Sequence, residues 1–243
     1  MLASLSRFSR TDKPFSLSDR AYLLIRSQIL KGELSPGTSL SRRKLAKELQ
    51  MSLLPVAEAL QRLEGEGLVE SRPRVGTRVC LPTAQDIREQ YQVREALESQ
   101  AARLFAEKAT AEEKREIAQM AERMDEMFSR CSALGTSQIP SDFLYEVHDY
   151  HVQLHLRIAE CTGCRALCQT IERNHILVFN WLYDVAAHRP SLPPRFHRDL
   201  IAALSKGDPE DADRAMRQHV RYGLENVLRG IAGTDSGSRQ EAG

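Results

Sequence analysis

The sequence contains no run of about 18 consecutive apolar residues, the length that a membrane-spanning helix needs. Its first residues, MLASLSRFSRTDKPF, also lack the apolar segment of a secretory signal. We therefore expect a cytoplasmic protein without a membrane partner.

Excess charge is also lacking, since the net charge is only +1 over 243 residues, which at first argues against a nucleic-acid-binding protein. The charge is unevenly distributed, however. Residues 1–82 hold 14 Lys and Arg against 8 Asp and Glu, a net of +6, whereas the rest hold 20 against 25, a net of −5. A basic first domain and an acidic second one fit a DNA-binding head on a body that avoids nucleic acid.

Cysteine is scarce, and three of the five cysteines form a CxxC pattern followed by a third, at Cys161, Cys164 and Cys168. Such spacing could indicate a redox or iron–sulfur site. No fourth cysteine lies near, and small thiols in an amphipathic helical pattern are usually packed core residues, which is the interpretation we favour. Cys80 and Cys131 stand apart from this group in the sequence.

Residues 34–79 contain two short helical patterns separated by a polar turn. The first helix is indicated by three leucines that share one face: Leu40, Leu45 and Leu49. Ser52 stands at the N-cap position of the second, which should begin near Leu53. Pro55 lies in its first turn, where a missing N–H costs nothing. After Gly65 and Gly67, LVESRPRVGTRV has two β-prone ends around a turn, which predicts a hairpin.

This order of helix, turn, helix and hairpin predicts a winged helix-turn-helix whose second helix enters the major groove of DNA. The basic first helix would cross the phosphate backbone, and arginines would line the hairpin. We expect these residues to bind DNA: Arg42, Arg43, Lys44, Ser52, Leu53, Pro55, Arg72, Arg74 and Gly76. The alternative is a chance pair of amphipathic helices with a basic, solvated edge.

The periodicity is helical almost throughout the remaining sequence. We expect a first helix in the head capped by Ser18, and a bundle helix opened by Thr83 or Asp86. Six bundle helices are predicted, at about 84–108, 110–132, 141–161, 164–187, 193–206 and 209–230. The predicted fold is mainly α: a flexible segment at 1–15, a winged helix-turn-helix at 16–80, a hinge at 81–85, an all-α bundle at 86–232 and a flexible tail at 233–243.

The segments SPGTSLSRRKLAKEL, PVAEALQRLEGEGLVE and RVGTRV resemble the N-terminal domain of GntR-family bacterial repressors. By position, Arg43 corresponds to an arginine that contacts DNA in that family, Ser52 to a small hydroxyl residue and Gly76 to the glycine at the wing tip. The family usually has arginine at the positions of Leu53 and Ala57, and neither side chain here can donate a hydrogen bond. We therefore expect an unusual operator, or more affinity from the wing and the basic helix.

Histidines form the second candidate site. His151 and His155 are spaced i, i+4 and project from one helical face, a spacing by which two imidazoles can hold one metal ion. His197 and His219 fall on the inward faces of two later helices, so four imidazoles could converge. Such a site suits a divalent transition metal such as Zn or Ni. The alternative is an ordinary surface or core histidine pair.

The segments DIREQYQVREALESQAARL, HVQLHLRIAECTGC and RFHRDLIAALSKGDPEDADRAMRQHV resemble the ligand-binding domain of the FCD branch of GntR regulators, in its VanR-like six-helix subgroup. That branch holds a metal by an aspartate, a histidine four residues later and two further histidines, which correspond to His155, His197 and His219. The aspartate position is His151 here, and Asp149 is a poor substitute because it points to nearly the opposite side. His151 either replaces the aspartate, leaves the site empty or binds the effector.

Arg94 corresponds to an arginine near the effector pocket of that branch, where a guanidinium can grip a carboxylate. The alternative for Arg94 is a helix-surface ion pair with Glu98. Asn174 is expected to contact the effector, and Asn180, Trp181 and Tyr183 on the same predicted helix could shape the pocket. The resemblance implies a small organic acid as effector.

Together these patterns favour a homodimeric transcription regulator, usually a repressor in this branch, that binds a double-stranded DNA operator and responds to a small carboxylate ligand with the help of a metal. Two alternatives remain. The metal itself could be the signal, or the histidines could serve a metal-dependent enzyme. An enzyme is not expected, because no acid or base is recognisable and a basic head would have no role in it.

Overall fold

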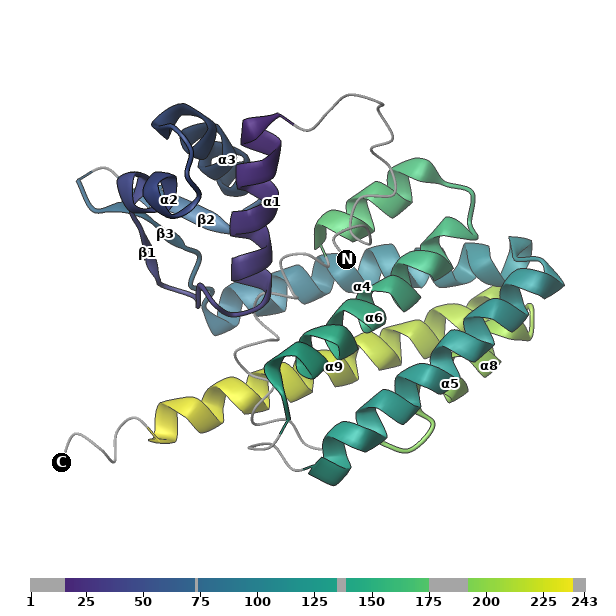
Figure 1. Ribbon diagram of the computed structural model, residues 1–243. Coiled ribbons are helices and arrows are strands. Elements are labelled where there is room, and N and C mark those ends of the chain that lie inside the picture. The colour runs from purple at the N-terminus through teal and green to yellow at the C-terminus, as the bar shows by residue number, and fades with distance from the viewer. Residues whose placement is uncertain (1–15, 73, 135–138, 175–191, 238–243) are drawn as a thin grey trace.

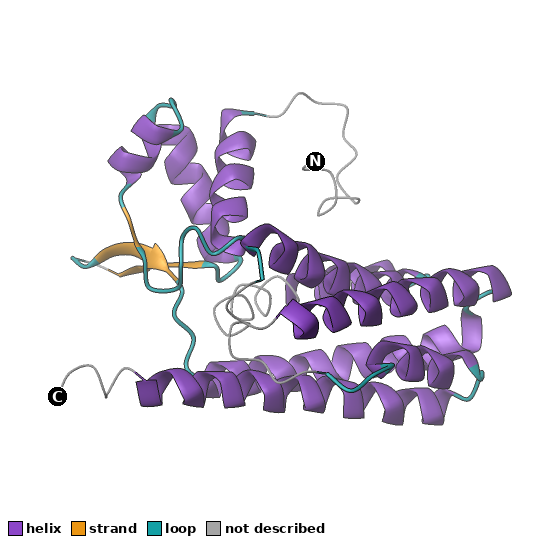
Figure 2. Ribbon diagram, turned by 60° about the horizontal axis from the view of Figure 1, so that its bottom comes forward, coloured by secondary structure: helices purple, strands orange, loops and turns teal. Residues whose placement is uncertain are grey.

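The computed structural model describes residues 16–72, 74–134, 139–174 and 192–237. They form a small head and a bundle of long helices (Figure 1). Among these described residues, strands occur only in the head (Figure 2). Within these described ranges, no helix is long and apolar enough to cross a membrane.

The head consists of three helices and a three-stranded antiparallel sheet in which β3 lies between β1 and β2. Its elements are α1 (Leu17–Leu30), β1 (Ser39–Leu40), α2 (Arg42–Glu48), α3 (Leu53–Gly65), β2 (Val69–Arg72) and β3 (Gly76–Val79). Ile25, Val56, Leu63 and Val79 are completely buried in its core. The predicted winged helix-turn-helix is thereby confirmed, including the start of its second helix at Leu53.

Two local predictions in the head are wrong. Ser16 rather than Ser18 caps α1, because its hydroxyl accepts a hydrogen bond from the Asp19 N–H while the Asp19 carboxylate accepts one from the Ser16 N–H. Leu40 lies in β1 instead of the following helix, since its backbone is paired with Thr77 of β3. That partner is remote in sequence, so local periodicity could not reveal the strand.

The bundle contains the six helices that were expected, as far as the structure describes them. Five are α4 (Ala84–Lys108), α5 (Ala111–Leu134), α6 (Ser141–Glu160), α8 (Phe196–Ser205) and α9 (Pro209–Gly237), and residues 165–174 are also helical. α4 packs along α9 (Figure 1). Phe105, Met124 and Leu154 are among the fully buried side chains of the bundle core. Assignment to the VanR-like subgroup stays a prediction.

The C-terminal helix is longer than expected. α9 continues to Gly237, so residues 233–237, which were predicted to belong to a flexible tail, are helical. Glycine and serine indicate a helix end, but a glycine costs only about 1 kcal/mol in a helix, and a helix already formed can extend over it. The predicted flexible segments at 1–15 and 238–243 lie outside the described residues.

Head and bundle meet at the predicted hinge and at a contact between α1 and α6. Thr83 and Asp86 together form the capping box that begins α4, so both residues suggested for this position take part. Leu30 at the end of α1 packs against Val152 of α6, and both are buried. The Lys31 ammonium lies 5.8 Å from the ring centre of Tyr145, also on α6.

The cysteines behave as packed side chains. Cys161 and Cys168 are buried in hydrophobic clusters, Cys164 is partly exposed, and none of the five forms a disulfide in the described structure. Burial raises the pKa of the Cys161 thiol to about 12, so it is not a ready thiolate ligand. The core interpretation of the CxxC pattern is therefore confirmed for Cys161 and Cys168.

Candidate functional site

Three of the four predicted histidine ligands converge inside the bundle. Nε2 of His155 lies 3.0 Å from Nε2 of His151 and 3.2 Å from Nε2 of His219 on α9. These three residues offer ligand atoms that all lie within 4.8 Å of one another. His197, at the start of α8, is beside them, with its ring centroid 5.0 Å from that of His151 and 5.3 Å from that of His219.

Two buried carboxylates orient the outer nitrogens of these rings. Glu98 of α4 lies 2.5 Å from Nδ1 of His155, and both side chains are almost completely buried. Asp125 of α5 lies 2.8 Å from Nδ1 of His197. In metal sites, a carboxylate on the far nitrogen fixes the tautomer and strengthens the imidazole as a ligand.

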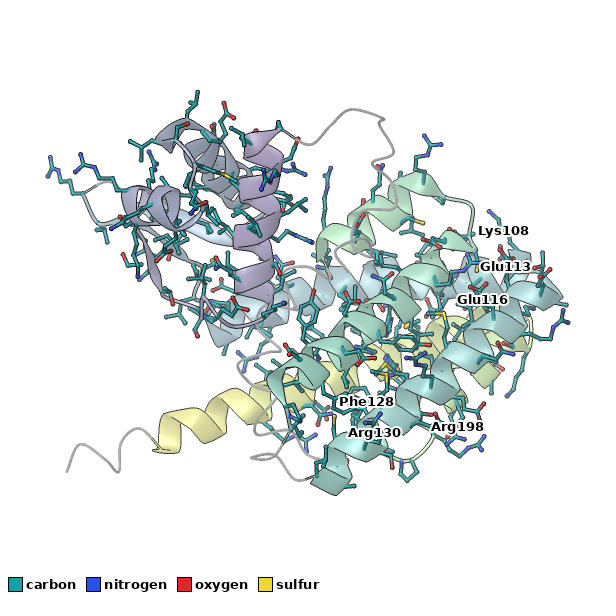
Figure 3. The ribbon with its side chains drawn as sticks, in the orientation of Figure 1. Lys108, Glu113, Glu116, Phe128, Arg130 and Arg198 are labelled. Atoms are coloured by element: carbon teal, nitrogen blue, oxygen red, sulfur yellow. The ribbon has the colours of Figure 1, made fainter. Side chains whose placement is uncertain are left out.

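Asp125 also fixes the beginning of α8. Besides the His197 ring, its carboxylate accepts hydrogen bonds from the backbone N–H groups of His197 and Arg198 and from Nε of Arg198. Burial alone would raise the pKa of Asp125, but these hydrogen bonds outweigh it and lower the pKa. Phe128, one turn of α5 further on, stacks on the His197 ring at 5.5 Å, and Figure 3 shows Phe128 and Arg198 at this part of the bundle.

Three of the four histidines, His151, His197 and His219, have surroundings that favour the neutral imidazole. Burial, and then the neighbouring His155, lower the pKa values of His151 and His219 well below the usual range. Burial also lowers the pKa of His197, although Asp125 opposes the shift. Neutral imidazoles have a lone pair to offer, which is the form that binds metals.

The donor set fits a divalent transition metal. In a tetrahedral zinc site with Zn–N distances of about 2.0–2.1 Å, ligand nitrogens lie about 3.3–3.4 Å apart, close to the 3.0 and 3.2 Å that separate Nε2 of His155 from those of His151 and His219. In the tautomer with its proton on Nδ1, towards Glu98, His155 offers the Nε2 lone pair to a metal. Nε2 of His197 is buried without a hydrogen-bond partner among the described residues.

Two interpretations were given for Arg94, a guanidinium near the effector pocket and a surface ion pair with Glu98. It does pair with Glu98, with Nε 2.5 Å from the carboxylate, but the pair is buried rather than on the surface. Its charge contributes to lowering the pKa values of His151 and His219, so it lies close to the histidines. Arg94, Glu98 and His155 thus form a continuous buried chain from guanidinium to imidazole.

Asn174 lies against the turn of α4 that precedes Arg94. Its Nδ2 donates hydrogen bonds to the backbone carbonyl and the side-chain oxygen of Gln90, at 3.3 and 3.0 Å. Its Oδ1 is buried with no partner among the residues that the structure describes. The other suggested pocket residues, Asn180, Trp181 and Tyr183, lie outside the described residues.

The predicted DNA-binding residues gather on the α2, α3 and wing side of the head. All but one are exposed: Arg42, Arg43, Lys44, Ser52, Leu53, Arg72, Arg74 and Gly76. Ser52 occupies the N-cap of α3, yet its hydroxyl accepts no capping hydrogen bond from the described residues around it. Gly76 has a φ of +102° in the wing, a conformation in which glycine is strongly favoured. Pro55 is the exception, because its side chain is buried in the head and is not available to DNA.

Residues 89–222 match the family described as the FCD domain, and residues 17–79 match the family described as bacterial regulatory proteins, gntR family. The first match alone covers more than half of the chain. The chain belongs to the gntR family, with an FCD domain. It is therefore a DNA-binding transcription regulator.

Relatives support the same assignment. The regulator is 28% identical over 215 residues to the HTH-type transcriptional repressor RspR of Escherichia coli (strain K12), covering 87% of this chain and 89% of that protein. It is 27% identical to the probable D-xylose utilization operon transcriptional repressor of Paenarthrobacter nicotinovorans, covering 97% and 98%. Among solved structures, E. coli McbR/YncC has a TM-score of 0.68 at 21% identity, over 90% of this chain and all of that one, which supports the fold alone.

Two residues of the site were missed by sequence reasoning. The sequence predicts Glu98 only as a surface partner of Arg94, although its second contact is with His155. Asp125 has no sequence signal, because its contact with His197 joins residues 72 positions apart. The i, i+4 spacing of Arg94 and Glu98 was the one available signal.

Proposed function

We propose that the regulator is a homodimeric repressor that binds a small organic acid through a transition metal, Zn or Ni, held by His151, His155 and His219 with His197 beside them. When bound, the metal supplies a Lewis-acidic centre that attracts a carboxylate. The observation that carries the proposal is the convergence of three imidazole Nε2 atoms, the central one backed by a buried carboxylate. Arg94 adds a cation close to the same point.

The all-histidine donor set favours a borderline metal over a hard one. Where the branch has an aspartate, His151 supplies a neutral nitrogen, so the proposed site loses one negative charge. Imidazole suits Zn and Ni, whereas Mg and Ca prefer oxygen ligands. Asn174, with an unpartnered Oδ1, would complete the polar lining for the effector.

α6 offers a direct route from this site to the head. The two turns that carry His151 and His155 also carry Val152, which packs against Leu30 of α1. A ligand can shift the arrangement of the heads only if it binds one arrangement more tightly than another. In the proposed mechanism, occupation of the site changes the position of α6, and α6 changes that of α1.

The test is DNA binding by the full chain in three states: dialysed against a chelator, reloaded with Zn or Ni, and reloaded with added organic acids. Fluorescence anisotropy on labelled DNA flanking the regulator's own gene is the readout. An organic acid that changes the affinity only when metal is present would support the proposal. Dependence on metal alone would favour metal sensing, and independence of both would contradict regulation through this site.

Arg43→Ala is expected to weaken DNA binding to a similar extent on every sequence and to reduce the salt slope by about one, because an exposed arginine on α2 would neutralise one phosphate. Affinity measured from 50 to 200 mM salt gives the slope. Arg20→Ala, an exposed arginine on α1, is the matched control and should leave the slope unchanged. An unchanged slope for Arg43→Ala would contradict the docking of α2 on the backbone.

Glu98→Gln is expected to lower the affinity for Zn about 10- to 100-fold, since it removes the carboxylate that orients His155. Competition with a chromophoric chelator measures this affinity. The matched control is Glu95→Gln. Glu95 lies on the same helix, but its carboxylate accepts hydrogen bonds from Arg217 and Arg221 instead. Equal metal affinity in the two variants would argue against a role for Glu98 behind the metal ligand.

A further inference from the structure

The exposed face of α3 is apolar at its beginning. The side chains of Leu53 and Leu54 are 51% and 67% exposed, although the next two residues are buried. Positions i, i+1, i+4, i+5 and i+8 share one side of a helix, so Ala57, Glu58 and Gln61 continue this face. We call these five residues the α3 face.

The α3 face carries no cation. Arg62 is the only basic residue in the sequence of α3, and its side chain contacts residues of the head outside the α3 face. Its guanidinium lies 3.7 Å from the ring centre of Tyr22 and forms ion pairs with Asp19 and Glu66. The cationic donor that most often recognises guanine is thus missing from this surface.

Positive charge is carried instead by the elements that precede and follow α3 in the head. Arg42, Arg43 and Lys44 are exposed on α2, and Arg72 and Arg74 are exposed on the wing. Exposed apolar side chains together with exposed cations in one small domain match a DNA duplex, whose major groove is bordered by two phosphate backbones. A protein partner would not require this charge.

We propose that Leu53 and Leu54 contact the 5-methyl groups of thymine and that thymine, rather than guanine, specifies the bases under the start of α3. The inference rests on the predicted docking of α3 in the major groove by this DNA-binding regulator. In the major groove only thymine presents a methyl group, whereas guanine is recognised through donors to N7 and O6. Further along the same face, Gln61 suits adenine and Glu58 suits the amino group of cytosine.

The test begins with selection of duplexes from a random double-stranded DNA pool by the full-length regulator. Each thymine of the selected half-site is then replaced in turn by uracil, which differs only by the missing methyl group. At one or two positions we expect a loss of affinity of about fourfold, the equivalent of about 0.8 kcal/mol for one buried methylene-sized group. At each methyl-dependent position, one of the two variants, Leu53→Ala or Leu54→Ala, should bind the thymine and uracil duplexes equally well.

Leu17→Ala is the matched control, since Leu17 is 53% exposed on α1 of the same head, and this variant should still distinguish the two bases. Leu53→Arg should select guanine at one position. Sequence-preferring binding that ignores the thymine methyl, or that keeps its methyl dependence in both alanine variants, would overturn the inference alone. Failure to retain any duplex would overturn the proposed DNA docking with it.

Discussion

His155→Ala is expected to weaken Zn binding more than about 100-fold, because loss of a residue behind a ligand already costs roughly 10- to 100-fold and here the ligand itself is lost. His155 is the central histidine, within 3.2 Å of both other Nε2 atoms. Isothermal titration of the chelator-treated protein with Zn measures the loss.

His148→Gln provides the control for this experiment. His148 is also buried on α6, one turn before His151, but it does not belong to the group of converging ligand atoms. This variant should keep one Zn per chain. If His148→Gln and His155→Ala lose Zn equally, the metal is not held where we propose.

Arg94→Leu should destabilise the protein by about 3–5 kcal/mol. Arg94 and Glu98 are 3% and 2% exposed, and removing one member of a buried ion pair leaves the other charge uncompensated. Burial by itself would lower the pKa of Arg94, but the interactions with Glu98 and Tyr91 together raise it, so the guanidinium is charged in the folded protein. Urea denaturation followed by circular dichroism measures the difference in the free energy of unfolding.

Arg221→Leu is the matched control for the buried pair. Arg221 pairs with Glu95 of the same helix α4, but its side chain is 64% exposed. Solvent screens exposed pairs, so this substitution should have a small effect. The double variant Arg94→Leu, Glu98→Leu should recover part of the lost stability. Equal losses for Arg94→Leu and Arg221→Leu would contradict the distinction between the two pairs.

The head could be predicted from the sequence because its determinants are local. Ser52, the buried leucines of α3 and the glycine in the wing each act within a few residues of their position. β1 could not be predicted, since its two residues are defined only by pairing with β3. The Ser16 cap was missed because two serines stood at acceptable positions, and only the reciprocal bond from Asp19 selects one.

The candidate site, like the head, could be predicted only where spacing along the sequence determines it. The i, i+4 spacing of His151 and His155 places both on one face, and the structure brings His219 to it. The carboxylates behind the rings were beyond local reasoning, because helix packing alone brings Asp125 to His197. Whether Arg94 pairs at the surface or in the interior likewise depends on which side of α4 the other helices cover.

The two contacts of α6 have a mechanical consequence. His155 and Val152 project from the same two turns, one towards the other histidines and one towards Leu30 of the head. Because a helix turns as a rigid body, rotation by about 10° moves side-chain atoms about 5–6 Å from its axis by about 1 Å on every side at once. Displacements of that size are typical of helix shifts in switching proteins. A small movement of the His155 imidazole would therefore be accompanied by an equal displacement of Val152 against α1, without any change in the internal structure of α6.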